Sequence, residues 1–193
     1  MFDSCQVSTK LKSQYHYVDN MFERLIKLLD FYANKHGKVL VVRFDITYPL
    51  LYPKVMSNEH IRLCMAKLVQ KYKRHGFDPY YMWTREQKVS LHPHYHCVLL
   101  LNGNLVRSFS HVFENARMLW SSTIGDNTPG LIDHCIDNPW MPGYENGIML
   151  VRAKADAQIT YDAVVTQLSY LAKMADKRDY GDPWRNFGMS ELS

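Results

Sequence analysis

The apolar positions of this chain recur with two different periods, which predicts helices and strands in turn. Helical spacing predicts helices over residues 20–36, 57–75, about 108–120 and 160–177. Apolar and β-branched runs predict strands over residues 39–47, 80–86, 91–101 and 148–152. Residues 1–20 show no clear period, and residues 121–147 hold many Gly, Pro, Asn and Asp, as in a long loop. The order of these segments predicts an α+β fold with a central, mostly antiparallel sheet and flanking helices. We expect one domain over residues 1–193.

The predicted strand over residues 39–47 separates apolar from polar side chains. Its even-numbered residues from Val42 to Ile46 are apolar and share one face, which we expect to be core. Arg43, Asp45 and Thr47 share the other face. This polar face is a candidate working surface, and Asp45 and Thr47 could serve as metal ligands or line a site.

A histidine pair marks the predicted strand over residues 91–101. His94 and His96 project from one face because side chains alternate along a strand, and His92 is a candidate to join them. Glu86 ends the preceding strand and can reach this face across an antiparallel hairpin. Two imidazoles and a carboxylate suit Mg²⁺, Mn²⁺ or Zn²⁺ and leave room for a phosphate oxygen. His92 and Glu86 compete for the third position.

The last predicted helix carries a candidate nucleophile. Tyr170 and Lys173 are three positions apart and share one helical face, with Gln167 and Lys177 along the same stripe. A phenol with a pKa near 10 is a poor nucleophile, whereas a nearby ammonium would favour the phenolate and offset phosphate charge. Tyr161 is about half a turn out of phase and should not serve the same site. The alternative is a core tyrosine beside a snorkelling lysine.

Composition and charge narrow the function only slightly. The formal net charge of +4 is compatible with nucleic-acid binding but does not require it. The four cysteines form no CxxC pair, which argues against a zinc ribbon or a disulfide framework and favours reduced thiols. No apolar run reaches membrane-spanning length and the N-terminus has no signal-peptide pattern, so we expect a cytoplasmic protein with no membrane partner.

Three short motifs occur in a recognisable order. His94-Tyr95-His96 is a His-hydrophobic-His motif, residues 44–49 (Phe-Asp-Ile-Thr-Tyr-Pro) precede it on a strand, and residues 170–173 (Tyr-Leu-Ala-Lys) form a later YxxK motif. Together they resemble the HUH endonucleases, the Rep and relaxase superfamily that nicks single-stranded DNA in rolling-circle replication. Glu86 sits where some Rep proteins place an acidic metal ligand. The resemblance covers about residues 38–178 and is strongest to inovirus gene-II-type replication initiators and their prophage-encoded relatives.

This resemblance implies a Rep-like (ferredoxin-like, RRM-related) architecture and a transesterification. Mg²⁺ or Mn²⁺, held by His94, His96 and Glu86, would polarise the scissile phosphate. Tyr170 would attack it, leaving a 5′-phosphotyrosyl link and a free 3′-hydroxyl, with Lys173 assisting by charge. The implied partners are single-stranded DNA with an origin hairpin and a separate host helicase, because the chain has no P-loop motif. The implied compartment is the bacterial cytoplasm. Four basic residues are expected to contact DNA: Arg43, Arg85, Lys88 and Lys177.

Other functions remain open from the sequence. One is a non-cleaving origin-binding protein or repressor on the same fold. Another is a structural zinc protein that uses the three histidines and a cysteine, although Cys97 should point to the opposite strand face. A third is a different metal-dependent phosphodiesterase in which Tyr170 is only a core residue.

Overall fold

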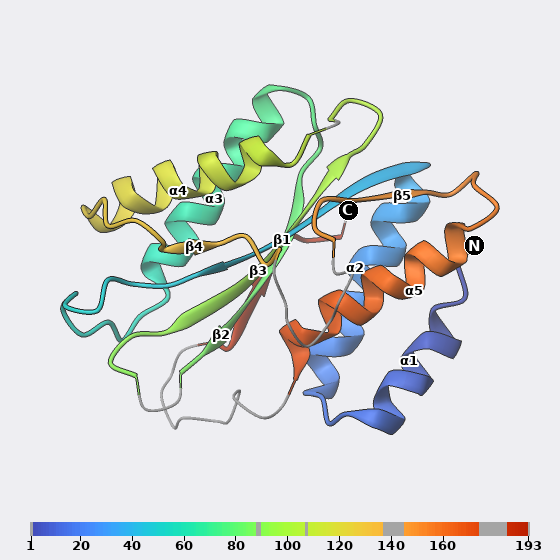
Figure 1. Cartoon of the computed structure of the whole chain (residues 1–193), viewed down its shortest axis with the longest axis horizontal. Helices are drawn as coiled ribbons and strands as arrows, with labels where there is room; N and C mark the ends of the chain where they lie inside the picture. The colour runs from blue at the N-terminus through green and yellow to red at the C-terminus, as the bar shows by residue number, and fades with distance from the viewer. Residues whose placement is uncertain (1, 88–89, 107, 137–144, 174–184, 193) are drawn as a thin grey trace.

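The computed structural model describes residues 2–87, 90–106, 108–136, 145–173 and 185–192. Figure 1 shows their arrangement as helices around one sheet. The elements are α1 (Ser4–Gln14), α2 (Asp19–Lys35), β1 (Lys38–Ile46), α3 (Glu59–Arg74), β2 (Tyr80–Glu86), β3 (His94–Asn102), α4 (Ser110–Ile124), β4 (Ile132–Asp133), β5 (Ile148–Val151), α5 (Ala157–Leu168), the 3₁₀ turn η1 (Ser169–Ala172) and β6 (Phe187–Met189). The α+β class predicted from the sequence is confirmed.

The described strands form one six-stranded sheet, and each pairing between them is antiparallel. The order is β4-β1-β3-β2-β6, and β5 pairs with β1 as well. β5 and β4 therefore share the outer edge of β1, β5 along residues 38–41 and β4 along residues 45–46. This antiparallel sheet with flanking helices is compatible with the Rep-like architecture expected above.

One side chain fills the interval between β5 and β4. The amide of Asn146 accepts a hydrogen bond from the backbone N–H of Arg43 and donates to the backbone oxygens of Arg43 and His134. Asn146 is itself buried. A side-chain amide thus replaces strand pairing in the stretch of β1, residues 42–44, that lies between the parts paired with β5 and β4, so the backbone polar groups of Arg43 stay satisfied.

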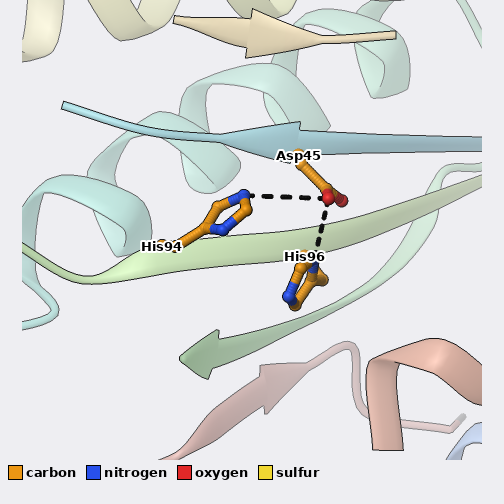
Figure 2. Close-up of side chains that lie close together, drawn as sticks. All are labelled: Asp45, His94 and His96. Carbon is orange, nitrogen blue, oxygen red and sulfur yellow. Dashed lines mark hydrogen bonds and ion pairs between the residues drawn. The ribbon is translucent and has the colours of Figure 1, made fainter. Parts of the chain in front are cut away.

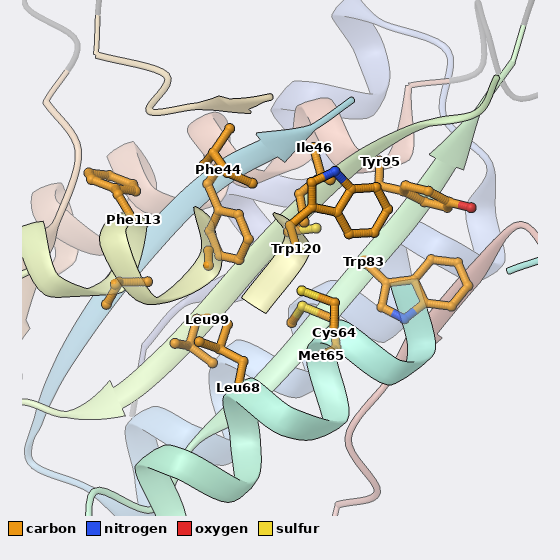
Figure 3. Packing of buried hydrophobic residues seen from close by; sticks show 14 of the residues in the cluster. Phe44, Ile46, Cys64, Met65, Leu68, Trp83, Tyr95, Leu99, Phe113 and Trp120 are labelled. Carbon is orange, nitrogen blue, oxygen red and sulfur yellow. The ribbon is translucent and has the colours of Figure 1, made fainter. Parts of the chain in front are cut away.

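The sheet separates two hydrophobic cores. The first lies between the sheet and helices α3 and α4, where Phe44, Ile46 and Tyr95 pack with Trp120 (Figure 3). The second lies under α1, α2 and α5 on the other face (Figure 1), and Val39 and Val41 of β1 belong to it. The predicted core face of β1 is confirmed, because its even-numbered residues from 40 to 46 belong to the first core.

The face that carries the second core has a polar end. Val98 and Leu100 of β3 lie in that core, and alternation along the strand puts His96 and His94 further along the same face. Arg43 and Asp45 continue the face on β1 in the same way. Thr84 and Glu86 do so on β2, beyond Met82. The candidate site therefore occupies the end of the sheet beyond the apolar contacts of α2 and α5.

Several elements differ from the sequence-based expectation. Helix α1 and the short strands β4 and β6 were not predicted. The predicted helix over residues 160–177 ends at Leu168 and tightens into the 3₁₀ turn η1. Within the predicted long loop, residues 137–144 lie outside the described part of the chain. None of the described helices has the length and apolar character needed to cross a membrane.

Candidate metal centre and its neighbouring tyrosine

The register of three strands brings the polar side chains together. Asp45 on β1 lies directly opposite His96 on β3. On the other side of β3, β2 places Thr84 opposite His96 and Glu86 opposite His94. Directly opposed residues in an antiparallel pair have Cβ atoms about 4.5–5.5 Å apart, close enough for their side chains to interact. The site is thus fixed by the backbone pairing of rigid strands.

Asp45, His94 and His96 form a group suited to a metal ion. One ligand atom from each lies within 4.8 Å of the others. His96 Nδ1 is 2.8 Å from Asp45 Oδ2, and His94 Nε2 is 3.7 Å from the same oxygen. Figure 2 shows the two rings on β3 and the carboxylate on neighbouring β1 pointing toward one another. Asp45, considered from the sequence as a lining residue or ligand, is therefore the carboxylate that completes this group.

Glu86 contacts the same histidine from the other side. His96 Nε2 is 2.8 Å from Glu86 Oε2, while His96 Nδ1 faces Asp45. The His96 side chain is only 2% exposed and is held between two carboxylates. A metal ion that uses His96 as a ligand would have to take over one of these two contacts. If the ion replaced the contact between His96 and Glu86, the freed Glu86 carboxylate could bind the ion as well, so Glu86 remains a candidate ligand.

The donor atoms in the group fit a divalent cation. Asp45 Oδ1 and His94 Nε2 are buried and have no hydrogen-bond partner among the described residues. Buried polar atoms without partners are costly in a native protein and call for an explanation such as a bound ion. Imidazole nitrogens and carboxylate oxygens together are a common donor set for divalent metals. The structure therefore contains a candidate metal centre.

The local electrostatics keep Asp45 and His94 in the forms that bind metals. Burial alone would raise the pKa of Asp45, but the hydrogen bond from His96 and the charges of His96, Arg43 and His94 lower it to about 2. Burial, then the charge of His96, lowers the pKa of His94, against the pull of the nearby carboxylates. Metal binding requires an ionised carboxylate and a neutral imidazole, so both shifts favour it.

Arg43 lies inside the site. Its Nη2 is 3.4 Å from Asp45 Oδ2, and its Cζ lies 4.6 Å from the centre of the Tyr170 ring. The residue is only 6% exposed. The sequence predicted that Arg43 contacts DNA, and in this structure it lies between the metal group and the candidate nucleophile.

Tyr170 lies beside the metal group. Its ring stands edge-on to His96 with ring centres 5.1 Å apart, and the residue is 37% exposed. Lys173 Nζ is 5.2 Å from the same ring. Tyr170 lies within the 3₁₀ turn η1 and Lys173 follows it directly. Positions three apart eclipse one another in such a turn, so the two side chains meet although the α-helix has ended.

The surroundings of Tyr170 raise the pKa of its phenol. Burial, and then the charge of Glu86, raises its pKa, and the charge of Arg43 opposes this only in part. That Lys173 favours the phenolate stays a prediction. The ammonium lies over the rings of Tyr170 and Tyr15. Deprotonation of Tyr170 would need a further positive charge at the site.

Tyr161 has a different role. It is fully buried, donates a hydrogen bond to Asp30 on α2 and stacks on Phe2. Burial raises its pKa first, with further contributions from Asp30. The expectation that Tyr161 does not serve the same site agrees with this position in the second core.

His92 does not join the histidine pair. Strand β3 begins at His94, so the alternation of faces does not extend back to residue 92. The His92 Nε2 atom is 2.6 Å from the backbone oxygen of Tyr52, and its ring packs against Tyr48 and Tyr52. The suggestion that His92 competes for the third ligand position is therefore wrong for this structure.

Thr47 and Cys97 were also considered as ligands. The Thr47 hydroxyl donates to the backbone oxygen of Leu131 at 3.5 Å. Cys97 is buried in the first core, on the opposite face of β3 from His96. Neither His92 nor Cys97 lies with His94 and His96, so these two residues do not complete a zinc site there.

Of the four basic residues predicted to contact DNA, the structure describes Arg43 and Arg85. Arg85 is fully buried and donates a hydrogen bond to the Gln87 side chain, so it cannot contact DNA in this structure. It lies on the opposite face of β2 from Glu86, which explains its burial. Lys88 and Lys177 lie outside the described residues.

The fold and the site define an α+β domain with a candidate metal centre beside a tyrosine. Residues 3–190 match the YagK/YfjJ C-terminal domain family, and the chain belongs to that family. It is similar to the uncharacterized protein YagK of Escherichia coli (strain K12), with 27% identity over 198 residues that cover 88% of this chain and 91% of that protein. No solved structure shows a significant match to the chain.

Proposed function

We propose that this protein is a single-stranded DNA nicking–joining endonuclease that initiates rolling-circle replication. One observation carries the proposal: the ring of Tyr170 lies 5.1 Å from that of His96. Two motifs far apart in the sequence, a candidate metal group and a candidate nucleophile, thereby meet at one end of the sheet. A phosphate bound at Asp45, His94 and His96 would lie beside the tyrosine.

In the proposed reaction, Asp45, His94 and His96 hold Mg²⁺ or Mn²⁺, with Glu86 as an additional oxygen donor. The ion would supply Lewis-acid polarisation of the scissile phosphate. The Tyr170 oxygen forms a bond to phosphorus as the bond from phosphorus to the 3′ oxygen breaks. The phenol loses its proton and the 3′ oxygen gains one, so a 5′-phosphotyrosyl link and a free 3′-hydroxyl result.

Charged side chains support this chemistry. The charge of Glu86 raises the pKa of the Tyr170 phenol, and an ion bound to this carboxylate would offset that charge. Arg43 and Lys173 lie over the Tyr170 ring and provide positive charge where phosphate charge develops. The substrate would be single-stranded DNA exposed at an origin hairpin in the bacterial cytoplasm. A separate helicase would unwind the duplex, since the chain has no P-loop motif.

A covalent-adduct assay tests the proposal. Purified protein is mixed with single-stranded DNA from its own replicon, with Mn²⁺ or with EDTA, and resolved on a denaturing gel. We expect a metal-dependent adduct that mass spectrometry maps to Tyr170. Tyr170→Phe should abolish the adduct and leave DNA binding intact, and Tyr161→Phe, which removes a phenol outside the site, should retain it.

Two outcomes would contradict the proposal. An adduct that persists in Tyr170→Phe would place the nucleophile elsewhere. DNA binding without any adduct or cut, on DNA that contains the origin, would favour the alternative of a non-cleaving origin-binding protein.

A further inference from the structure

The segment before α2 lies against the turn that carries Tyr170. Tyr17 forms an antiparallel bridge with Lys173, and the backbone N–H of Val18 donates to the backbone oxygen of Ala172 at 2.8 Å. The Tyr17 hydroxyl donates to the Ser169 hydroxyl at 3.2 Å. These contacts fix the backbone of residues 15–18 along η1, so Tyr15 has a defined position beside Lys173.

The Lys173 ammonium contacts two aromatic rings. Its Nζ is 4.5 Å from the ring centre of Tyr15 and 5.2 Å from that of Tyr170. Both distances are within the range of about 6 Å in which an ammonium is attracted to the face of an aromatic ring. On Tyr170, the Arg43 guanidinium carbon is 4.6 Å from the ring centre. Tyr170 is therefore contacted by two cations, and Tyr15 contacts one of them.

The two cations oppose one another. Burial and the charge of Arg43 lower the pKa of Lys173, which means that the site disfavours its charged form. The electron-rich face of an aromatic ring partly offsets that cost without adding a negative charge near the phosphate. Tyr15 supplies such a face at the distance given above.

We propose that Tyr15 is a positioning residue for the nicking reaction, whose ring holds the Lys173 ammonium against Tyr170. The inference rests on the proposed function of Tyr170. It assigns a role to the segment before α2, which lies outside the three motifs. The ring is the part that acts, and the hydroxyl is not required. Tyr15 is 48% exposed, so its truncation removes little of the buried core.

The first measurement compares wild type, Tyr15→Ala and Tyr15→Phe in single-turnover adduct formation on the replicon's single-stranded DNA with Mn²⁺. Tyr15→Ala should slow the rate at saturating DNA roughly tenfold, with little change in DNA affinity, because a lost cation–π contact affects the charge at the reacting phosphate. Tyr15→Phe should retain the wild-type rate. A wild-type rate in Tyr15→Ala, or an equally slow rate in Tyr15→Phe, would overturn the proposal.

The second measurement does not depend on catalysis. Reaction of Lys173 with an N-hydroxysuccinimide ester, followed by mass spectrometry, reports how well the ammonium is held and covered. Labelling should be faster in Tyr15→Ala than in wild type and Tyr15→Phe, with exposed Lys10 as the internal reference. Equal Lys173 rates in all three proteins would overturn the inference. If wild type forms no adduct, the proposed function fails, and the labelling result still decides whether Tyr15 holds Lys173.

Discussion

Replacing Asp45 by Asn should remove a specific part of the protein's stability against acid. In the metal-free protein the pKa of Asp45 is about 2, compared with an ordinary value of 3.8. At 1.36 kcal/mol per pKa unit, the ionised carboxylate contributes about 2 kcal/mol to folding. Because the folded-state pKa is the lower one, this contribution is fully present above about pH 5 and is lost as the pH falls toward 2. About half should be lost by pH 3.

Urea unfolding followed by circular dichroism, in EDTA at pH 6, 4 and 3, measures the effect. The difference in unfolding free energy between wild type and Asp45→Asn should shrink by about 1 kcal/mol from pH 6 to pH 3. Asp156→Asn is the matched control, because Asp156 is exposed and its side chain caps no backbone group of α5. A difference that stays constant with pH would refute the ion pairing of Asp45 with His96.

Two further substitutions test the site and its support. His96→Ala should weaken Mn²⁺ binding in calorimetry and adduct formation in the gel assay together, since His96 contacts both carboxylates; unchanged metal-dependent nicking would reject the site. Asn146→Ala should lower the unfolding free energy by roughly 2 kcal/mol, because it leaves buried backbone groups of β1 unpaired. A thermal melt equal to that of wild type would show that Asn146 is dispensable.

The parts of the site that follow from local periodicity were predictable. Alternation along single strands placed His94 with His96 and separated Arg43 and Asp45 from the apolar residues of β1. The same rule failed for His92, because it holds only within a strand and β3 begins two residues later. The alternation of side chains therefore predicted which residues share the site, but it did not predict at which residue each strand begins.

The contacts between distant segments were not predictable from one sequence. Asp45 completes the metal group because of the register between β1 and β3, which the sequence does not state. The stacking of Arg43 on Tyr170 depends on where α5 ends, and the predicted helix was too long. Helix α1 was not predicted because only two of its residues, Val7 and Leu11, are buried. Two apolar positions give too weak a helical pattern to recognise in the sequence.

The pairing of residues 15–18 with η1 has a consequence for how the protein is made. A ribosome releases β1, β2 and β3 long before the segment that carries Tyr170, so the strands of the metal group can pair first. The contacts of residues 15–18 with η1 can form only after Lys173 has been synthesised, because the two segments are far apart in the sequence. A nascent chain would thus hold the candidate metal ligands before it holds Tyr170, and the proposed reaction could begin only after the segment that carries this tyrosine has been made.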